Sequence, residues 1–375
     1  MALRMRGAQS FRQRLVCATL AGTPFRIDEI RASDSNPGLR DFEANLLRLL
    51  EKVTNGCVVE INETGTRLRY KPGVIVCGGG LVHDCGTSRG IGYFLEPLIL
   101  LALFAKKNLQ IVLRGVTNGL QDPGVDTFRT TTLPLLRQFG VSTDGLELRI
   151  VKRGAPPLGG GEVMLKVPVV GASLQAVNWT DEGMVKRIRG VAYSARVSPQ
   201  MANRMVDSAR GVLNRLLPDV YIFTDHYTGA ESGKSPGYGL ALVAESTSGC
   251  LISTEATAEV SSAADERDRE AGPAPEALLP EDIGARAAHQ LLDEIRQGGV
   301  VDSTHQGFLF MLCALCPEDV SKVRVGRLSP NAIRMLRCIK DFFGVQFSIK
   351  PDSATGTVIL SCVGSGYKNL SRKVG

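Results

Sequence analysis

Apolar residues recur at three- and four-residue intervals in several segments of the chain, which is the spacing of one buried helix face. In the first such segment, Asn36 suits a helix cap and Pro37 suits the first helical position. Asn55-Gly56 then ends the predicted helix, and residues 57–61 form a short strand-like run. The apolar face of this helix consists of Leu39, Phe42, Leu46, Leu49 and Val53.

The same order of helix, glycine and strand returns twice more. A predicted helix over 127–139 is followed by Gly140 and a strand over 146–151. Another, over 330–343, is followed by Gly344, a strand over 345–349 and a hairpin into 357–363. The helix predicted over 87–104 and the strand 109–114 form a looser copy. Such units predict an α/β (α+β) fold of repeated two-layer modules, each with helices on a four-stranded sheet.

Residues 186–284 interrupt this repeat. They contain an amphipathic helix over 199–216 and strand-like runs over 221–224, 239–246 and 250–254. We therefore expect a smaller inserted α/β domain over 186–284, with residues 1–185 and 285–375 forming one large domain. Residues 255–278 are rich in Ala, Glu, Asp, Ser and Pro, and this composition predicts a mobile loop.

Composition narrows the class of protein without identifying it. The 375 residues are 43% hydrophobic and 22% charged, with a formal net charge of +6, which permits binding to polyanions without requiring it. The nine cysteines are scattered in apolar patterns, as expected for reduced, buried thiols of an intracellular protein. Cys313 and Cys316 lack further ligands at zinc-binding spacing, so we expect no metal site. The N-terminus lacks an apolar signal core, and the longest apolar runs are too short to cross a membrane.

The most distinctive segment is 153–163, in which a basic residue precedes two prolines and three glycines. Consecutive glycines let a ligand approach the backbone, and successive amide groups can cradle an anion. Arg153 with Gly159, Gly160 and Gly161 is therefore a candidate site for a phosphate. A tight loop before a strand is the alternative interpretation. The segment reads Arg-Gly-Ala-Pro-Pro-Leu-Gly-Gly-Gly-Glu-Val.

This spacing resembles the signature of the RNA 3′-terminal phosphate cyclase family. The resemblance extends over nearly the whole chain, including Lys71-Pro72-Gly73 and the stretch from Arg114 to Pro123. Further phrases are similar to a subgroup of cyclase-like proteins of ribosome assembly. They are Arg187-Ile-Arg-Gly-Val-Ala-Tyr-Ser194, Val197-Ser-Pro-Gln-Met-Ala-Asn-Arg204, Ser232-Gly-Lys-Ser-Pro-Gly237 and Leu279-Pro-Glu-Asp-Ile-Gly284.

The resemblance implies a mechanism that this chain has lost. In the family, a histidine at the start of the last helix attacks ATP and carries AMP to an RNA 3′-phosphate, which then closes into a 2′,3′-cyclic phosphate. Here Asn331 stands at that position, and an amide is not a nucleophile for nucleotidyl transfer. The family's N-terminal glycine-rich loop is also reduced to Arg6-Gly7-Ala8-Gln9. We therefore expect no cyclase activity and no cofactor, and none of the four histidines offers a replacement.

The subgroup implies a non-cyclase role in processing the small-subunit (18S) pre-rRNA. It implies a ribosome-assembly GTPase as a partner, contact with pre-rRNA in the small-subunit processome, a nuclear and nucleolar location, and an association with endonucleolytic cleavage. Basic residues that could contact RNA are Arg187 and Arg189, and on the last helix Arg337 and Lys340 are candidates for a part in cleavage. Solvated charged faces are the alternative for each. The other functional class is an active ATP-dependent RNA 3′-terminal phosphate cyclase.

Overall fold

The computed structural model describes residues 3–258 and 279–369, in which helices and strands form a mixed α/β fold. Within these residues there are four four-stranded sheets, and three of them share one strand order. In each of the three, the first strand pairs in parallel with the second, the second pairs antiparallel with the fourth, and the third lies at the edge. The predicted fold class of repeated helix-and-sheet modules is confirmed.

The first module holds the N-terminal part of the chain, and a two-stranded ribbon of β3 (Thr54–Asn55) and β6 (Val74–Ile75) adjoins it. Its elements are β1 (Leu3–Arg6), α1 (Phe11–Ala21), β2 (Phe25–Asp28), α2 (Asp41–Val53), β4 (Val58–Ile61) and β5 (Leu68–Lys71).

The second module follows directly, and its second helix is built from short segments of different helical type. Its elements are β7 (Leu81–Asp84), α3 (Gly92–Ala102), β8 (Leu109–Gly115), α4 (Val125–Thr127), η1 (Phe128–Thr132), α5 (Leu133–Leu135), η2 (Leu136–Phe139), β9 (Glu147–Lys152) and β10 (Gly161–Val167). The third module is divided by an insertion. Its elements are β11 (Asn178–Trp179), α8 (Gln306–Ala314), β16 (Val320–Val325), α9 (Pro330–Phe343), β17 (Ser348–Asp352) and β18 (Thr357–Val363).

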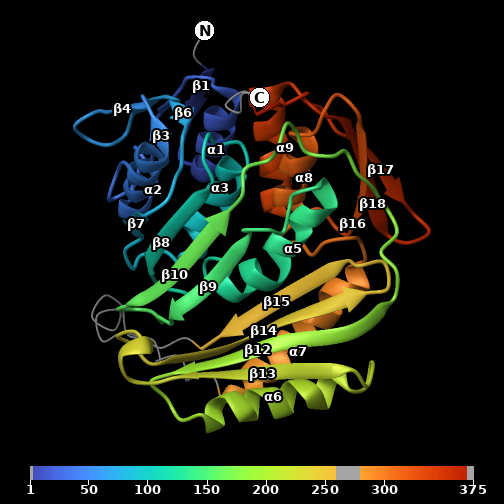
Figure 1. The fold of residues 1–375 in the computed structure, drawn as a ribbon. Coiled ribbons are helices and arrows are strands. Elements are labelled where there is room, and N and C mark those ends of the chain that lie inside the picture. Colours follow the sequence, from blue (N-terminus) through green and yellow to red (C-terminus); the bar gives the residue numbers. More distant parts are fainter. Residues whose placement is uncertain (1–2, 259–278, 370–375) are drawn as a thin grey trace.

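The insertion lies between the first strand and the first helix of the third module. Its sheet has the order β13-β12-β14-β15, and in Figure 1 it lies below the three modules with β15 nearest to α5. Its elements are β12 (Val185–Ala195), α6 (Gln200–Leu213), β13 (Val220–Tyr227), η3 (Gly229–Glu231), β14 (Gly237–Ser246), β15 (Leu251–Thr257) and α7 (Pro280–Gln297).

Glycines end helices where the sequence placed them. Gly140 and Gly344 follow the second helices of the second and third modules, with φ of 77° and 70°. The helix expected to begin at Pro37 begins instead at Asp41. Gly38 has φ of 89°, and a Cβ there would meet the carbonyl oxygen of Thr64, so this segment packs as a loop against the turn of the β4–β5 hairpin.

Two separate apolar cores correspond to the modules and the insertion. One buried cluster runs through all three modules, and a second lies between the inserted sheet and the helices α6 and α7. No helix in the described residues is both long enough and apolar enough to cross a lipid bilayer. The expected boundary at residue 284 falls inside α7, whose Ile283, Ala287 and Leu291 belong to the second core. We therefore propose that the inserted domain extends to Gln297.

The expected mobile loop over 255–278 begins with residues that are part of the sheet, and this portion of the prediction is wrong. β15 continues to Thr257, while residues 259–278 lie outside the described part of the chain. The carboxylate of Glu255 accepts hydrogen bonds from the Gly124 backbone N–H at 2.6 Å and from Thr127 Oγ1 at 3.0 Å. Glu255 thereby joins the inserted sheet to the start of α4.

The environment of Glu255 predicts a measurable dependence of stability on pH. Burial raises the pKa of its carboxyl to about 7, above the ordinary value of 4.5. A carboxyl with a raised pKa stabilises the fold below its ordinary pKa, and this contribution is lost as pH rises through 7. From pH 5 to 7, Glu255→Gln should therefore gain stability over the wild type by roughly 1 kcal/mol per pH unit. Urea unfolding at several pH values measures the free energy of unfolding of both proteins. If the free energies of the wild type and of Glu255→Gln change with pH in parallel, the prediction is contradicted. Glu63→Gln, in an exposed turn, is the control.

Candidate functional site

A cleft of about 640 Å³ opens where several helices begin. Ser10 and Phe11 line it at the start of α1, Phe42 at the start of α2, Tyr93 at the start of α3, and Asn331 at the start of α9. The N-terminus of a helix carries free N–H groups and a partial positive charge, so the convergence of four of them favours an anion. The repeated modules thus bring equivalent helix ends around one cavity.

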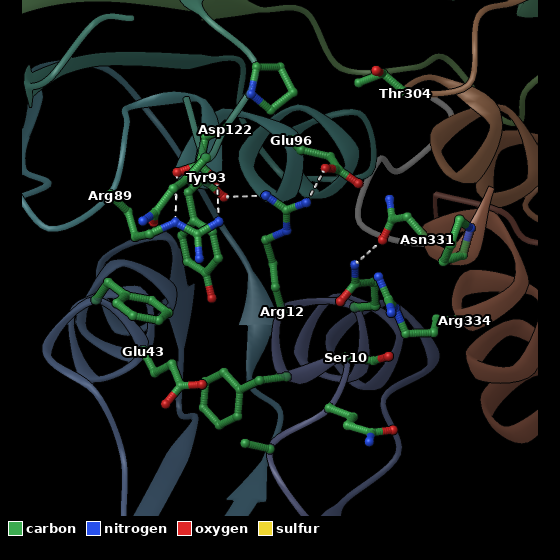
Figure 2. A pocket seen from close by; sticks show the side chains of 18 of the residues that line it. Ser10, Arg12, Glu43, Arg89, Tyr93, Glu96, Asp122, Thr304, Asn331 and Arg334 are labelled. Atoms are coloured by element: carbon green, nitrogen blue, oxygen red, sulfur yellow. Dashed lines mark hydrogen bonds and ion pairs between the residues drawn. The ribbon is translucent and has the colours of Figure 1, made fainter. Parts of the chain in front are cut away.

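Three guanidinium–carboxylate pairs stand in the cleft wall. Figure 2 shows two of them, Arg12–Glu96 and Arg89–Asp122. Each carboxylate lies on a different element from its arginine, so the pairs also hold the modules' loops and helices together. Two of the guanidinium groups, those of Arg12 and Arg89, lie over the Tyr93 ring at 4.9 and 4.6 Å from its centre. The pairs are Arg12–Glu96 at 2.6 Å, Arg31–Glu43 at 2.7 Å, and Arg89–Asp122.

Tyr93 remains a neutral phenol in this setting, because burial raises its pKa well above the ordinary value. Arg334 is different from the other three arginines of the cleft. It is exposed, and within residues 3–258 and 279–369 its side chain forms no hydrogen bond or ion pair. The cleft is lined by four arginines and three carboxylates, so it carries an excess positive charge at Arg334.

Asn331 lies in the first turn of α9, where the sequence predicted it, and it lines the cleft. Its Oδ1 accepts a hydrogen bond from Gln13 Nε2 at 2.9 Å. Ala8 and Gln9, from the reduced glycine loop, line the same cleft. Asn331 and the reduced loop, the two differences from the cyclase pattern, therefore line one cavity. This cavity holds an amide where nucleotidyl transfer would need an imidazole.

Arg153 does not line this cleft, and its contacts favour a structural role, so its binding of an external anion stays a prediction. Its side chain is 1% exposed. All three guanidinium nitrogens donate to internal acceptors, with 2.6 Å to Asp126, 2.8 Å to Asp225 and 3.1 Å to Asn118. Tyr193 from the insertion lies against the guanidinium at 4.7 Å. Arg153 therefore binds the inserted domain to the second module.

The glycines of the same loop pack against the insertion. The Lys234 N–H donates to the carbonyl oxygen of Gly159 at 2.9 Å. A Cβ on Gly160 would lie 3.0 Å from Lys234 Cγ, and Gly161 begins β10 opposite Gly115. A close backbone approach explains these glycines without a ligand. Anion binding by these glycines stays a prediction.

The remaining predicted residues lie elsewhere on the surface. Arg187 pairs with Glu245 and Arg189 pairs with Asp219, all within the insertion. Arg337 and Lys340 are exposed on α9 beyond the cleft, and in the described part of the protein neither side chain has a hydrogen bond or ion pair. The structure thus brings Asn331 and Arg334 together and places Arg187, Arg189 and Arg153 outside that site.

The histidine nearest to the cleft is structural. His305 donates through its backbone and pairs through Nδ1 with Asp302 at 2.8 Å, while Nε2 contacts Thr132 Oγ1 at 2.8 Å. Burial opposes its charge, but the Asp302 carboxylate outweighs that effect and raises the pKa of His305. Among the described residues, no group of three or more His, Cys, Asp or Glu side chains is arranged to hold a metal ion.

Sequence reasoning missed most of the residues that line the cleft. Arg12, Arg31, Arg89 and Tyr93 belong to no local motif, and the carboxylate partners of the three arginines are 84, 12 and 33 positions away. The available signals were Asn331 and the reduced loop at residues 6–9, of which Ala8 and Gln9 line the same cavity.

Comparison of the sequence with known protein families identifies one family. The sequence model of the RNA 3′-terminal phosphate cyclase family matches residues 3–349. The chain belongs to this family. A "Probable RNA 3'-terminal phosphate cyclase-like protein" of Arabidopsis thaliana is 57% identical, covering 99% of this chain and 98% of that protein. The human "RNA 3'-terminal phosphate cyclase-like protein" is 53% identical, covering 98% and 96%. The "rRNA processing protein rcl1" of Schizosaccharomyces pombe is 45% identical, covering 99% and 98%.

Proposed function

We propose that this family member acts in processing the small-subunit (18S) pre-rRNA and has no cyclase activity. The observation that carries the proposal is the full-length similarity, at 45% identity, to a protein named for rRNA processing. The cleft supports it, because four arginines and three carboxylates line the cavity while Asn331 stands at the position of the family's nucleophile. A charged site without a nucleophile is suited to binding.

RNA phosphate is the ligand that this surface fits best. Arg334 lines the cleft, and Arg337 and Lys340 follow at intervals of three residues along α9. Residues three apart lie on neighbouring parts of a helix surface, so the three cations form one row. Phosphate contacts of this kind position an RNA strand without reading its sequence.

The finer parts of the proposal come from the resemblance to the ribosome-assembly subgroup. They are a ribosome-assembly GTPase as partner, action within the small-subunit processome, and location in the nucleolus of the nucleus. A part in endonucleolytic cleavage would fall to Arg337 and Lys340, which could position a phosphate and stabilise charge without a metal ion. No observation favours the alternative of an active ATP-dependent cyclase, because the position of its nucleophile is occupied by an amide.

Purification of the tagged full-length protein from its own cells tests the proposal. We expect it to recover precursors of the small-subunit rRNA together with a GTPase, which sequencing and mass spectrometry would identify. Untagged cells taken through the same steps are the control. Recovery of only tRNA ends or mRNA fragments would overturn the proposed role and favour a function in end repair.

A further inference from the structure

The inserted sheet has one face covered by helices and another that is only partly covered. α6 and α7 pack on the first face and enclose the second apolar core. On the other face, Ser253 and Glu255 of β15 and Asp225 of β13 bind the large domain. The first half of β13 lies at the edge of the sheet, before Asp225. Tyr221 and Phe223, two positions apart on β13, are 63% and 53% exposed on this face.

The two rings are neighbours on one surface. Residues two apart in a strand point to the same side, about 6.6 Å from each other. In the register with β12, Tyr221 lies beside Arg189 and Phe223 beside Val191. Isolated exposed apolar residues are ordinary on a protein surface, but adjacent large aromatic groups on an open sheet mark an interaction surface.

The charges beside the rings indicate the kind of partner. β12 has an irregularity between Val185 and Arg187, and there Lys186 and Arg187 both contact one carboxylate, that of Glu245, at 2.8 and 2.6 Å. Arg189 pairs with Asp219 at 2.7 Å. Three cations are thus matched by two carboxylates, and the guanidinium groups keep free N–H donors.

We propose that this face, defined by Tyr221, Phe223, Arg187 and Arg189, binds single-stranded RNA by stacking two bases on the rings. Four-stranded sheets with helices behind and aromatic side chains in front bind RNA in this way, with cations at the phosphates. Net positive charge around the rings favours RNA over an apolar protein surface, which would leave those cations buried. The inference rests on the proposed role in pre-rRNA processing and gives it a second contact, distinct from the α9 row.

Fluorescence anisotropy with a labelled 12-nucleotide oligouridine tests the stacking surface. Tyr221→Ala with Phe223→Ala should weaken binding at least about 10-fold, because each stacked base contributes about 1–3 kcal/mol. The salt dependence should stay unchanged, since stacking releases no counterions. Binding of an RNA duplex of equal length should also be unaffected, and Tyr221→Phe with Phe223→Tyr should retain full affinity.

The matched control is Val58→Ala with Ile61→Ala, which removes two exposed apolar side chains from β4, another edge strand. Oligouridine binding that is equal in the wild type and in the double variant of Tyr221→Ala with Phe223→Ala would overturn the inference and leave the proposed function standing. A wild type that binds no RNA would refute both. The inference would also be overturned if the wild type sediments as a dimer and the double variant as a monomer, with unchanged RNA affinity. That result would assign the face to self-association.

Discussion

Replacing Arg153 by methionine is expected to lower the free energy of unfolding by about 3–5 kcal/mol, which is the usual effect of removing one partner from a buried ion pair. The variant would leave the Asp126 carboxylate, which is fully buried, without its bidentate partner. The Asp225 carboxylate and the Asn118 side-chain oxygen would at the same time lose the hydrogen bonds that they accept from Arg153. Methionine retains much of the side-chain length, so the loss comes mainly from the Asp126 carboxylate, which would keep only Arg129 at 3.1 Å and the Asn118 amide as partners.

Urea unfolding followed by circular dichroism measures the effect. A second variant, Arg153→Met with Asp126→Asn, should recover part of the loss, because it removes the buried carboxylate charge as well as its main partner. Arg137→Met, at an exposed position of η2, is the control and should change stability by less than about 0.5 kcal/mol. If Arg153→Met weakens RNA binding while leaving stability intact, the anion-binding interpretation of the loop is correct and the structural one fails.

Local patterns were sufficient to predict the modules. The helix over 330–343 has the predicted bounds, because a serine cap, a proline at the first position and a glycine at the end all act within one segment. The same local features located Asn331 at a helix start, and the family resemblance gave that place its meaning. The break in helix-and-strand alternation predicted an inserted domain. It did not predict that the segment from β12 to α7 lies between β11 and α8 of the third module.

Tertiary partners could not be predicted, and they decide what each charged residue does. Arg153 next to a glycine-rich segment has the local signature of a phosphate site. Its role is set by Asp126 and Asp225, which are 27 and 72 positions away. Arg12 and Arg89 likewise show no pattern in sequence, yet they meet at one tyrosine because the modules are arranged around a common cleft.

Reversing the three charges of the α9 row should have the largest effect on RNA binding. The variant carries Arg334→Glu, Arg337→Glu and Lys340→Glu. In a plot of the logarithm of oligouridine affinity against the logarithm of salt concentration, its slope should be shallower than that of the wild type by about 2. Each lost phosphate contact with a single strand removes about 0.7 from the slope. Affinities converge near 1 M salt, so this corresponds to roughly 100-fold weaker binding at 0.1 M. All three side chains are exposed, so the fold should be retained.

The control must separate a specific row from general electrostatic attraction. Lys106→Glu, Lys107→Glu and Lys350→Glu change the net charge equally at exposed positions away from α9. This control should lose only the small affinity that a change in the long-range field produces, and its salt slope should stay close to the wild-type value. Equal losses in the two triple variants would show that RNA responds to the overall charge of +6 rather than to a track beside Asn331, and the cleft would then lose its proposed role in RNA binding.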